Sequence, residues 1–232
     1  MFNSIANARN SALVSAECHR LIETVSIPRS KRILDIFGAS IGLIILSPLF
    51  LLIAVAVGLS SPGPVFFTQT RYGQGARRIR IHKFRTMSWH HCDALGVTQA
   101  TNNDVRVTRL GRILRWTSFD ELPQLWNVLT GELSLVGPRC HVPNMLAGGV
   151  PYEQLVPHYE MRHQVVPGMT GLAQVRGLRG PTTNAKLAIR RVHADIEYIQ
   201  NWSIVMDVII LIRTLFLPFR GLSTLARGAA DA

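Results

Sequence analysis

The chain has 232 residues and a formal net charge of +11, and 47% of its residues are hydrophobic. This length allows one domain, or a domain with a membrane element. A basic soluble protein commonly binds nucleic acid, but the high apolar content and the lack of a basic stripe or groove-binding module argue against that class. We therefore expect an anionic membrane surface, an anionic substrate, or both as partners, and no nucleic acid.

The first 28 residues contain no apolar core of the kind found in signal peptides. Their best apolar run is interrupted by Glu17, Arg20 and Glu23, so we expect no signal peptide and interpret residues 1–28 as a short cytosolic tail or a weak amphipathic helix. The 3 cysteines of the chain are far apart and have no metal-site spacing. This pattern predicts free thiols in a reducing compartment.

A long apolar stretch runs from Ile36 to Leu59 without a charged residue. A straight helix rising about 1.5 Å per residue would cover roughly 36 Å, enough to cross a bilayer core of about 30 Å. However, Pro48 falls in its middle, where it removes one backbone hydrogen bond and crowds the carbonyl of Ile44. We therefore predict a kink with two short arms.

Both ends of this stretch are basic, with Arg29, Lys31 and Arg32 before it and several arginines after it. A spanning helix would place one basic cluster outside the cell, against the positive-inside bias. A re-entrant helix over residues 29–60, bent at Ser47 and Pro48, avoids this. The residues alone leave both forms open. Ser47 is expected to hydrogen-bond back to Leu43 and ease the broken ladder.

A β-hairpin is predicted after the apolar stretch, with strands near residues 65–67 and 80–84 and a turn over 71–75. The arginines at 77, 78 and 80 fit contacts with anionic lipid headgroups. The run His90-His91-Cys92-Asp93 is interpreted as a loop, because adjacent side chains rarely converge on one ion and no second ligand pair follows.

The segment from Ser118 to Arg139 carries two adjacent carboxylates, Asp120 and Glu121, in a basic context. A carboxylate can attack phosphorus or hold Mg²⁺, while arginines neutralise phosphoryl oxygens. This suggests a site that handles phosphate and a divalent metal. The alternative is a capping box, in which Ser118 and Glu121 cap a helix over residues 118–129 that ends at Gly131. Pro123 is unfavourable inside such a helix, so a start a few residues later stays open and would weaken this alternative.

Two further helices are predicted. One runs from residue 186 to 200 with Thr183 as its cap, and the other is an interfacial helix over residues 204–219. The final residues, 221–232, are rich in small side chains, and we expect them to be disordered.

Nine short motifs then occur in an order that resembles the bacterial sugar transferases, the monotopic polyprenyl-phosphate phosphoglycosyl transferases of the hexose-1-phosphate type. The resemblance covers about residues 29–219. Its motifs are KRILD (31–35), SP (47–48), SSPGPVFF (60–67), KFRTM (83–87), RVTRLGRILR (106–115), SFDELPQL (118–125), SLVGPR (134–139), PGMTG (167–171) and DIEYIQNWS (195–203). The resemblance favours the re-entrant form of the apolar helix.

The resemblance also implies roles for the matched residues. Asp120 would be the nucleophile, Glu121 would hold Mg²⁺, and Lys83 and Arg139 would bind phosphoryl oxygens. The other candidate substrate contacts are Arg85, Arg106, Arg109, Arg162, Arg176, Asp195 and Tyr198. After SLVGPR the family usually has a second proline, where this chain has Cys140.

The expected fold is therefore α+β and mainly helical: a monotopic membrane protein with an N-terminal re-entrant helix, a small β-hairpin and interfacial amphipathic helices. Residues 61–220 would form a catalytic domain on the cytoplasmic face of the bacterial inner membrane. The implied reaction transfers a sugar 1-phosphate from a UDP-sugar to polyprenyl phosphate and releases UMP, which begins exopolysaccharide or glycan assembly. The implied partners are these two substrates and membrane lipids, and a homo-oligomer is left open. A non-catalytic membrane scaffold of a polysaccharide synthase is the alternative.

Overall fold

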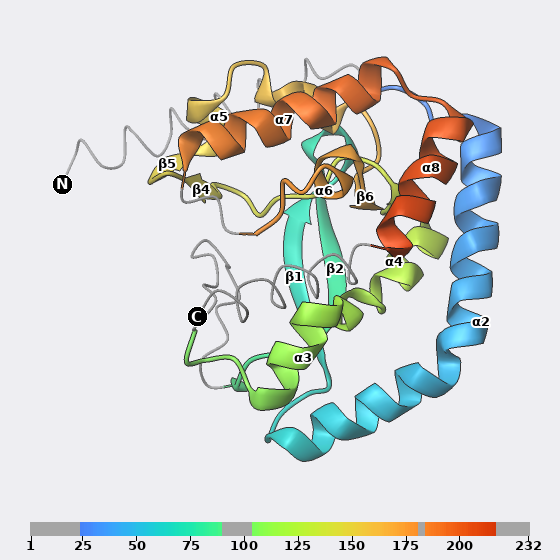
Figure 1. Ribbon diagram of the computed structural model, residues 1–232, viewed down its shortest axis with the longest axis vertical. Helices are drawn as coiled ribbons and strands as arrows, with labels where there is room; N and C mark the ends of the chain where they lie inside the picture. Colours follow the sequence, from blue (N-terminus) through green and yellow to red (C-terminus); the bar gives the residue numbers. More distant parts are fainter. Residues whose placement is uncertain (1–23, 90–103, 181–183, 217–232) are drawn as a thin grey trace, which may run out of the picture.

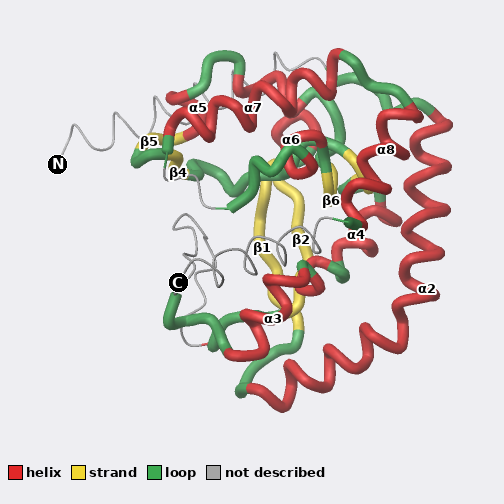
Figure 2. Tube along the Cα trace, viewed as in Figure 1, coloured by secondary structure: helices red, strands yellow, loops and turns green. Residues whose placement is uncertain are grey.

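The computed structural model describes residues 24–89, 104–180 and 184–216, and it has a mainly helical α+β fold as predicted (Figures 1 and 2). The run at 90–93 and both terminal segments beyond residues 24 and 216 lie outside the described residues. The helices are α2 (Arg29–Ser60), α3 (Arg109–Thr117), α4 (Gln124–Thr130), α5 (Tyr152–Leu155), α6 (Leu172–Val175), α7 (Ala185–Gln200) and α8 (Ile204–Leu215). The strands are β1 (Phe66–Tyr72), β2 (Arg78–Phe84), β3 (Ser134–Val136), β4 (Leu146–Ala147), β5 (Val150–Pro151) and β6 (Gly168–Thr170).

Helix α2 is long and apolar enough to cross a membrane by length and composition, with only 11% of its most apolar window buried. It changes direction partway along (Figure 1), and Pro48 is the proline inside it. The Ser47 hydroxyl donates to the carbonyl of Ile44 at 2.8 Å. That carbonyl, not the predicted one of Leu43, is the one that Pro48 leaves without an amide donor. The Ser47 hydroxyl therefore replaces the backbone hydrogen bond that Pro48 removes.

The first turns of α2 are fastened to the rest of the protein by buried charges. Lys31 Nζ donates to Asp207 of α8 at 2.7 Å and to the Tyr198 hydroxyl of α7 at 3.2 Å. One turn further, Asp35 accepts a hydrogen bond of 2.9 Å from the Ser134 hydroxyl of β3. The sequence alone placed Lys31 in a basic flank and in the KRILD motif but predicted no partner for it. In the structure it fixes the membrane helix to the core.

The predicted hairpin is present, and its strands are longer than expected. Strands β1 and β2 pair antiparallel, with Phe66 opposite Phe84 and Tyr72 opposite Arg78. The other sheets are also two-stranded: β3 pairs parallel with β6, and β4 pairs antiparallel with β5. The largest buried cluster joins the inner faces of α2, α4, β3 and α8, and includes Val128, Val136 and Ile210. This core holds the hairpin against α4.

The helix predicted over residues 118–129 is instead two elements. Ser118 has a φ of 62° and ends α3, and the next turn, Phe119–Glu121, is a 3₁₀ turn. Helix α4 begins only at Gln124 and ends, as predicted, at Gly131, whose φ is 86°. The Ser118 side chain makes no capping hydrogen bond, so the capping-box alternative is wrong. Pro123 explains the late start, because it favours the first turn of a helix over its interior.

Two helix boundaries near the C-terminal end also differ from prediction. The cap of α7 is Asn184, whose side chain accepts from the Lys186 amide at 2.8 Å, whereas Thr183 lies outside the described residues. Helix α8 begins after Ser203, whose hydroxyl accepts from the Met206 amide, and ends at Leu215. Its outer face is apolar and exposed, as an interfacial helix requires.

Candidate active site

A cavity of about 670 Å³ lies between the hairpin, the 3₁₀ turn after α3, the segment after β3 and helix α6. Its lining is strongly cationic and includes Arg71, Lys83, Arg85, Arg106, Arg115, Arg139, Arg179 and Arg191. Two acids, Asp120 and Glu121, lie in the same lining, and Leu135, Met169 and Leu211 contribute apolar surface. Such a lining suits a polyanionic ligand with an apolar part.

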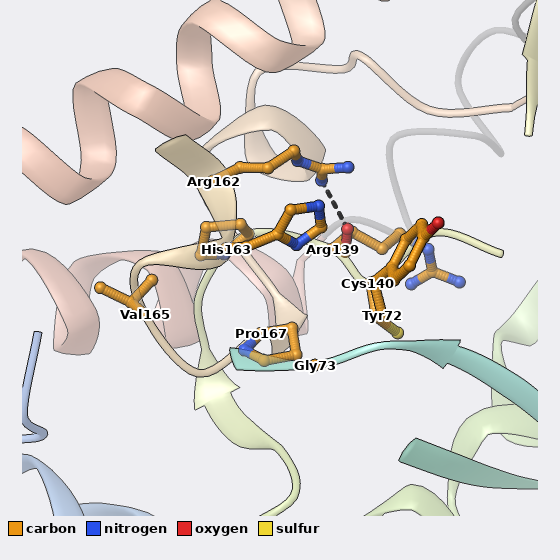
Figure 3. Close-up of a pocket in the computed structure, with 9 residues that line it drawn as sticks. Tyr72, Gly73, Arg139, Cys140, Arg162, His163, Val165 and Pro167 are labelled. Carbon is orange, nitrogen blue, oxygen red and sulfur yellow. Dashed lines mark hydrogen bonds between the residues drawn. The ribbon is translucent and has the colours of Figure 1, made fainter. Parts of the chain in front are cut away.

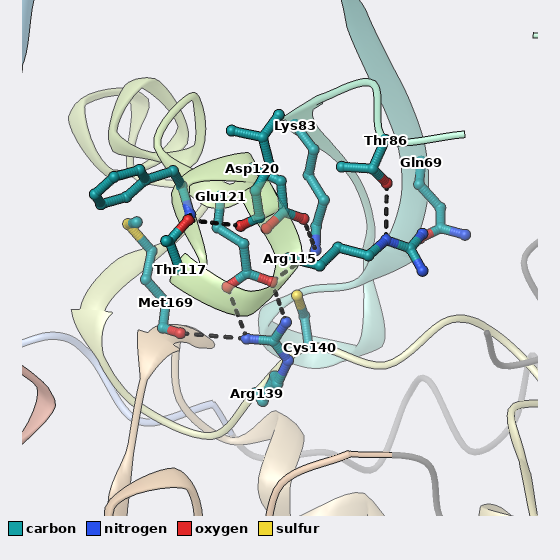
Figure 4. Close-up of polar contacts among 12 residues, drawn as sticks. Gln69, Lys83, Thr86, Arg115, Thr117, Asp120, Glu121, Arg139, Cys140 and Met169 are labelled. Atoms are coloured by element: carbon teal, nitrogen blue, oxygen red, sulfur yellow. Dashed lines mark hydrogen bonds and ion pairs between the residues drawn. The ribbon is translucent and has the colours of Figure 1, made fainter. Parts of the chain in front are cut away.

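Glu121 is the centre of an ion-pair cluster in this cavity (Figure 4). Its Oε1 accepts from Lys83 Nζ at 2.7 Å and also pairs with Arg139 Nη2, while its Oε2 accepts from Arg139 Nη1 at 3.1 Å. Burial alone would raise the pKa of Glu121, but the combined charges of Arg139 and Lys83 hold it well below the usual value. Glu121 is therefore ionised throughout the physiological range, and it aligns two cations.

Asp120 differs from its neighbour. It is 8% exposed, and its nearest cation is Lys83, whose Nζ lies 3.9 Å from Oδ2. Burial raises the pKa of Asp120, and the Glu121 charge raises it further, while Lys83 partly opposes the shift. A carboxylate that is poorly solvated and has no close hydrogen-bond donor among the described residues is more nucleophilic than a paired one.

The fold of the 118–121 segment explains why these two acids differ. The left-handed residue Ser118 ends α3 with its amide bonded to the Arg115 carbonyl, and the chain then tightens into the 3₁₀ turn. Adjacent side chains in such a turn project in different directions. Glu121 consequently reaches Arg139, while Asp120 faces the cavity close to Lys83 and to the charge of Arg115.

Four of the predicted basic contacts, Lys83, Arg85, Arg106 and Arg139, line this cavity. Arg85 is only 3% exposed, and its guanidinium donates to the carbonyls of Val57, Ser61 and Pro62 at the end of α2. Arg85 thus caps the C-terminal end of α2 by binding carbonyl oxygens there. The Arg106 side chain forms a bidentate pair with Asp104, in which Nε donates to Oδ1 at 2.9 Å and Nη2 donates to Oδ2 at 2.6 Å.

Arg162 and Asp195 lie behind the cavity wall. They form a fully buried ion pair of 2.7 Å, and the same guanidinium donates to the backbone carbonyl of Arg139 at 2.5 Å (Figure 3). The geometry therefore makes Arg162 a support for the backbone of Arg139. Neither residue of this pair belongs to the cavity lining.

The remaining predicted contacts lie elsewhere among the described residues. Tyr198 is 2% exposed and donates to Asp207 at 2.7 Å in the cluster that fastens α2. Arg176 forms an exposed ion pair with Glu197, and Arg109 is exposed on α3. The cavity lining does not include these three predicted contacts.

The structure also brings residues into the cavity that the motifs did not single out, namely Arg71, His141, Gln174 and Arg191. Two of them stand beside matched motifs, since His141 follows SLVGPR by two residues and Gln174 follows PGMTG by three. Proximity to a motif was the only signal that the sequence offered. Arg71 and Arg191 carry no such signal, because a single arginine in a basic chain is usually on the surface.

The carboxylate dyad lies in a cationic cavity that suits anionic substrates, and the long apolar helix α2 suggests membrane association. The chain belongs to the bacterial sugar transferase family, whose family model matches residues 27–221.

Several relatives support this assignment. The chain is 52% identical over 185 residues to the exopolysaccharide production protein PSS of Rhizobium leguminosarum bv. phaseoli, covering 80% of this chain and 92% of that protein. It is 50% identical over 193 residues to the UDP-glucose:undecaprenyl-phosphate glucose-1-phosphate transferase of Caulobacter vibrioides, covering 82% of this chain and 70% of that protein. The enzyme of the same name from Escherichia coli K12 is 49% identical over 189 residues, covering 82% of this chain but only 40% of that protein.

Proposed function

We propose that this protein transfers a sugar 1-phosphate from a UDP-hexose to undecaprenyl phosphate, releases UMP and begins the assembly of an exopolysaccharide or related glycan. The observation that carries the proposal is the dyad: Asp120 is buried and loosely paired, whereas Glu121 is paired with Lys83 and Arg139 in the same cationic cavity. The names of the relatives supply the reactants.

In the first step, a carboxylate oxygen of Asp120 attacks the β-phosphorus of the UDP-sugar. A phosphorus–oxygen bond forms to Asp120, the bond to the bridging oxygen breaks, and UMP leaves with the electron pair. The enzyme then carries the sugar phosphate on Asp120 as an acyl phosphate. The transition state gathers negative charge on the phosphoryl oxygens, which Lys83 and Arg139 are placed to offset.

In the second step, a phosphate oxygen of undecaprenyl phosphate attacks the same phosphorus, and the Asp120 carboxylate leaves. The lipid diphosphate sugar is the product. The lipid substrate reaches the site from the bilayer, and the apolar wall of Leu135, Met169 and Leu211 fits its first isoprene units. Because Arg85 ties the end of α2 to a cavity-lining position, the membrane helix and the site are held in fixed relation.

Mg²⁺ is part of the proposal. Mg²⁺ commonly takes one or two carboxylates together with substrate phosphates, and the two adjacent carboxylates on the cavity wall fit that donor set. No group of three or more His, Cys, Asp or Glu able to hold a metal occurs among the described residues, so the substrate would supply the other ligands. With substrate bound, Lys83 and Arg139 would turn from Glu121 to the diphosphate, and Glu121 would hold the ion, which would neutralise further charge there.

The proposed location is the bacterial inner membrane, with the site on its cytoplasmic face. The basic residues at both ends of α2 favour a helix that enters and leaves by the same face, and the change of direction in α2, which contains Pro48, supports that path (Figure 1). Such a re-entrant helix places the cavity at headgroup level, where a soluble UDP-sugar and a lipid phosphate can both reach it.

The experiment incubates purified protein with a UDP-sugar and no lipid acceptor. A burst of UMP stoichiometric with protein, and a hexose phosphate on the Asp120 peptide by mass spectrometry, are expected. Addition of undecaprenyl phosphate should then remove the adduct. Absence of UMP release with every UDP-sugar in a panel, with and without lipid acceptor, would contradict the proposal and favour a non-catalytic membrane scaffold. The same panel identifies the preferred sugar.

A further inference from the structure

Three polar side chains on the cavity wall are almost completely buried and have atoms without partners. Gln174, His141 and Arg191 are 5%, 2% and 6% exposed. Among the described residues, no hydrogen bond reaches either amide atom of Gln174, Nε2 of His141 or Nε of Arg191. A buried polar atom left without a partner destabilises the folded protein, so most such atoms are paired. Such atoms on the wall of a ligand-sized cavity indicate contacts that a ligand completes.

The hydrogen bonds around Tyr159 determine which ring nitrogen of His141 carries the proton. Arg162 Nη1 donates to the Tyr159 hydroxyl at 3.3 Å, and this hydroxyl lies 3.0 Å from His141 Nδ1. A guanidinium can only donate, so the Tyr159 oxygen accepts from Arg162 and its proton is directed to Nδ1. Burial, followed by the charge of Arg162, holds the pKa of His141 well below its usual value, so the ring is neutral. Its remaining proton is therefore on Nε2, a donor that has no partner among the described residues.

The helix that carries Gln174 and the helix that leads into the dyad lie near opposite ends of the hairpin (Figure 1). Helix α6, which carries Gln174, is near the end of the hairpin where β1 finishes, whereas α3, which leads into Asp120, is near the opposite end (Figure 1). Arg139 and Arg179 line the cavity and lie within electrostatic range of each other. A UDP-sugar with its phosphates beside Asp120 and these arginines would thus extend either its nucleoside or its sugar along the hairpin towards Gln174.

We propose that Gln174 recognises the uracil ring of the donor nucleotide, and that His141 donates from Nε2 to an oxygen of the same nucleoside. The inference rests on the proposed function, which supplies a UDP-sugar as donor. A primary amide carries a donor and an acceptor side by side, and the edge of uracil presents N3–H and a carbonyl oxygen in the complementary arrangement.

The surroundings of Gln174 favour the base over the sugar. Ala173 and Leu178 also line the cavity and belong to one apolar cluster. The faces of a planar base are apolar and pack against such side chains, whereas a hexose has hydroxyl groups around its ring that would lose hydrogen bonds there. Paired hydrogen bonds at the edge and apolar contacts at the faces together fit uracil.

The test measures equilibrium binding of UMP and of 3-methyl-UMP, which lacks the N3–H donor, to the purified full chain in lipid nanodiscs by calorimetry. The wild-type protein should bind UMP about 10- to 100-fold more tightly than 3-methyl-UMP. In Gln174→Met, affinity for UMP should fall to the level of 3-methyl-UMP, and affinity for 3-methyl-UMP should be nearly unchanged.

A matched control is Gln124→Met. Gln124 is also buried, at 3% exposed, and its Nε2 has no partner among the described residues, but it does not line the cavity. This variant should keep the wild-type preference. Gln174→Leu also removes both the amide donor and the amide acceptor, so it gives the same comparison if Gln174→Met does not fold.

Equal loss of both ligands in the Gln174 variants, or retention of the preference for UMP, would overturn the assignment to uracil. The two proposals fail in different ways. If the wild-type protein discriminates between the nucleotides but turns over no UDP-sugar, the proposed function fails and the base site stands. If turnover is normal but the Gln174 variants still discriminate, only the base site fails.

Discussion

At the scale of single residues, the two adjacent acids are expected to respond differently to substitution. Asp120→Asn removes the attacking charge, so UMP release should fall by at least about 10³-fold, with folding retained. Glu121→Gln removes the charged acceptor of Lys83 and Arg139, so it should also lower the free energy of unfolding by about 1.5–3 kcal/mol. Activity assays and thermal unfolding measure both effects.

The control for this pair is Ser118→Ala. Its side chain makes no capping hydrogen bond, so stability should change by less than about 0.5 kcal/mol. A clear loss of stability in Ser118→Ala, together with full activity in Asp120→Asn, would restore the capping-box interpretation and remove the nucleophile.

The shifted pKa of Asp120 predicts a pH dependence of the reaction. Asp120 attacks only when ionised, and burial raises its pKa, so kcat/KM should fall as the pH drops through that raised pKa. Lys83 lowers the pKa of Asp120, hence Lys83→Met should move this acidic limb to higher pH, whereas Lys83→Arg should leave it nearly in place. A pH profile that is unchanged in Lys83→Met would assign the limb to another group.

Substitution of Arg162 tests whether this buried residue holds the backbone of Arg139 in place. Arg162→Lys keeps the charge opposite Asp195 but loses the planar fork that also reaches the Arg139 carbonyl. We expect roughly a 10-fold loss of kcat/KM and a loss of stability of about 1.5–3 kcal/mol. Arg176→Lys, which alters the exposed pair with Glu197, should change neither measurably. Equal effects in the two variants would contradict the supporting role.

At the scale of elements, the joint between α2 and α8 depends on one buried ion pair. Lys31→Met would leave the fully buried Asp207 without its cation, and the loss of stability should be about 3–5 kcal/mol. Adding Asp207→Asn to that variant should recover part of the loss, since the unpaired charge is then gone. Arg29→Met, at an exposed position of the same helix, is the control, and thermal unfolding in detergent is the measurement.

The elements differ in how well they could be predicted. The hairpin and α2 follow from local patterns: alternation, turn residues and a long uncharged run containing Pro48. The turn at Ser118 does not, because a non-glycine residue with φ near 60° is uncommon and is selected by the packing around it. The helix does not start at residue 118 but at Gln124, the later start that Pro123 left open, and it ends as predicted at Gly131, where glycine favours the left-handed conformation.

At the scale of the whole molecule, the topology of α2 in the membrane can be tested with single cysteines in a background without Cys18, Cys92 and Cys140. Ser30→Cys and Arg77→Cys are exposed positions on the two sides of α2. If the helix re-enters, an impermeant thiol reagent should label neither in intact cells and both after lysis. Labelling of one position from outside would establish a spanning helix.

Pro48→Ala should straighten the helix, and new labelling of one of the two cysteine positions from outside would show this.

The amino-acid sequence by itself determined the membrane helix, the hairpin, the family motifs and the acidic dyad, because composition and short spacings encode local structure. Only the tertiary structure decided which charges work together. Lys31 and Asp207 are 176 positions apart, and Arg162 and Asp195 are 33 apart, so no local pattern links them. The same holds for Gln174 and His141, which enter one cavity with the dyad. A buried charge must be paired when the chain folds, and its partner is chosen by packing rather than by distance along the chain.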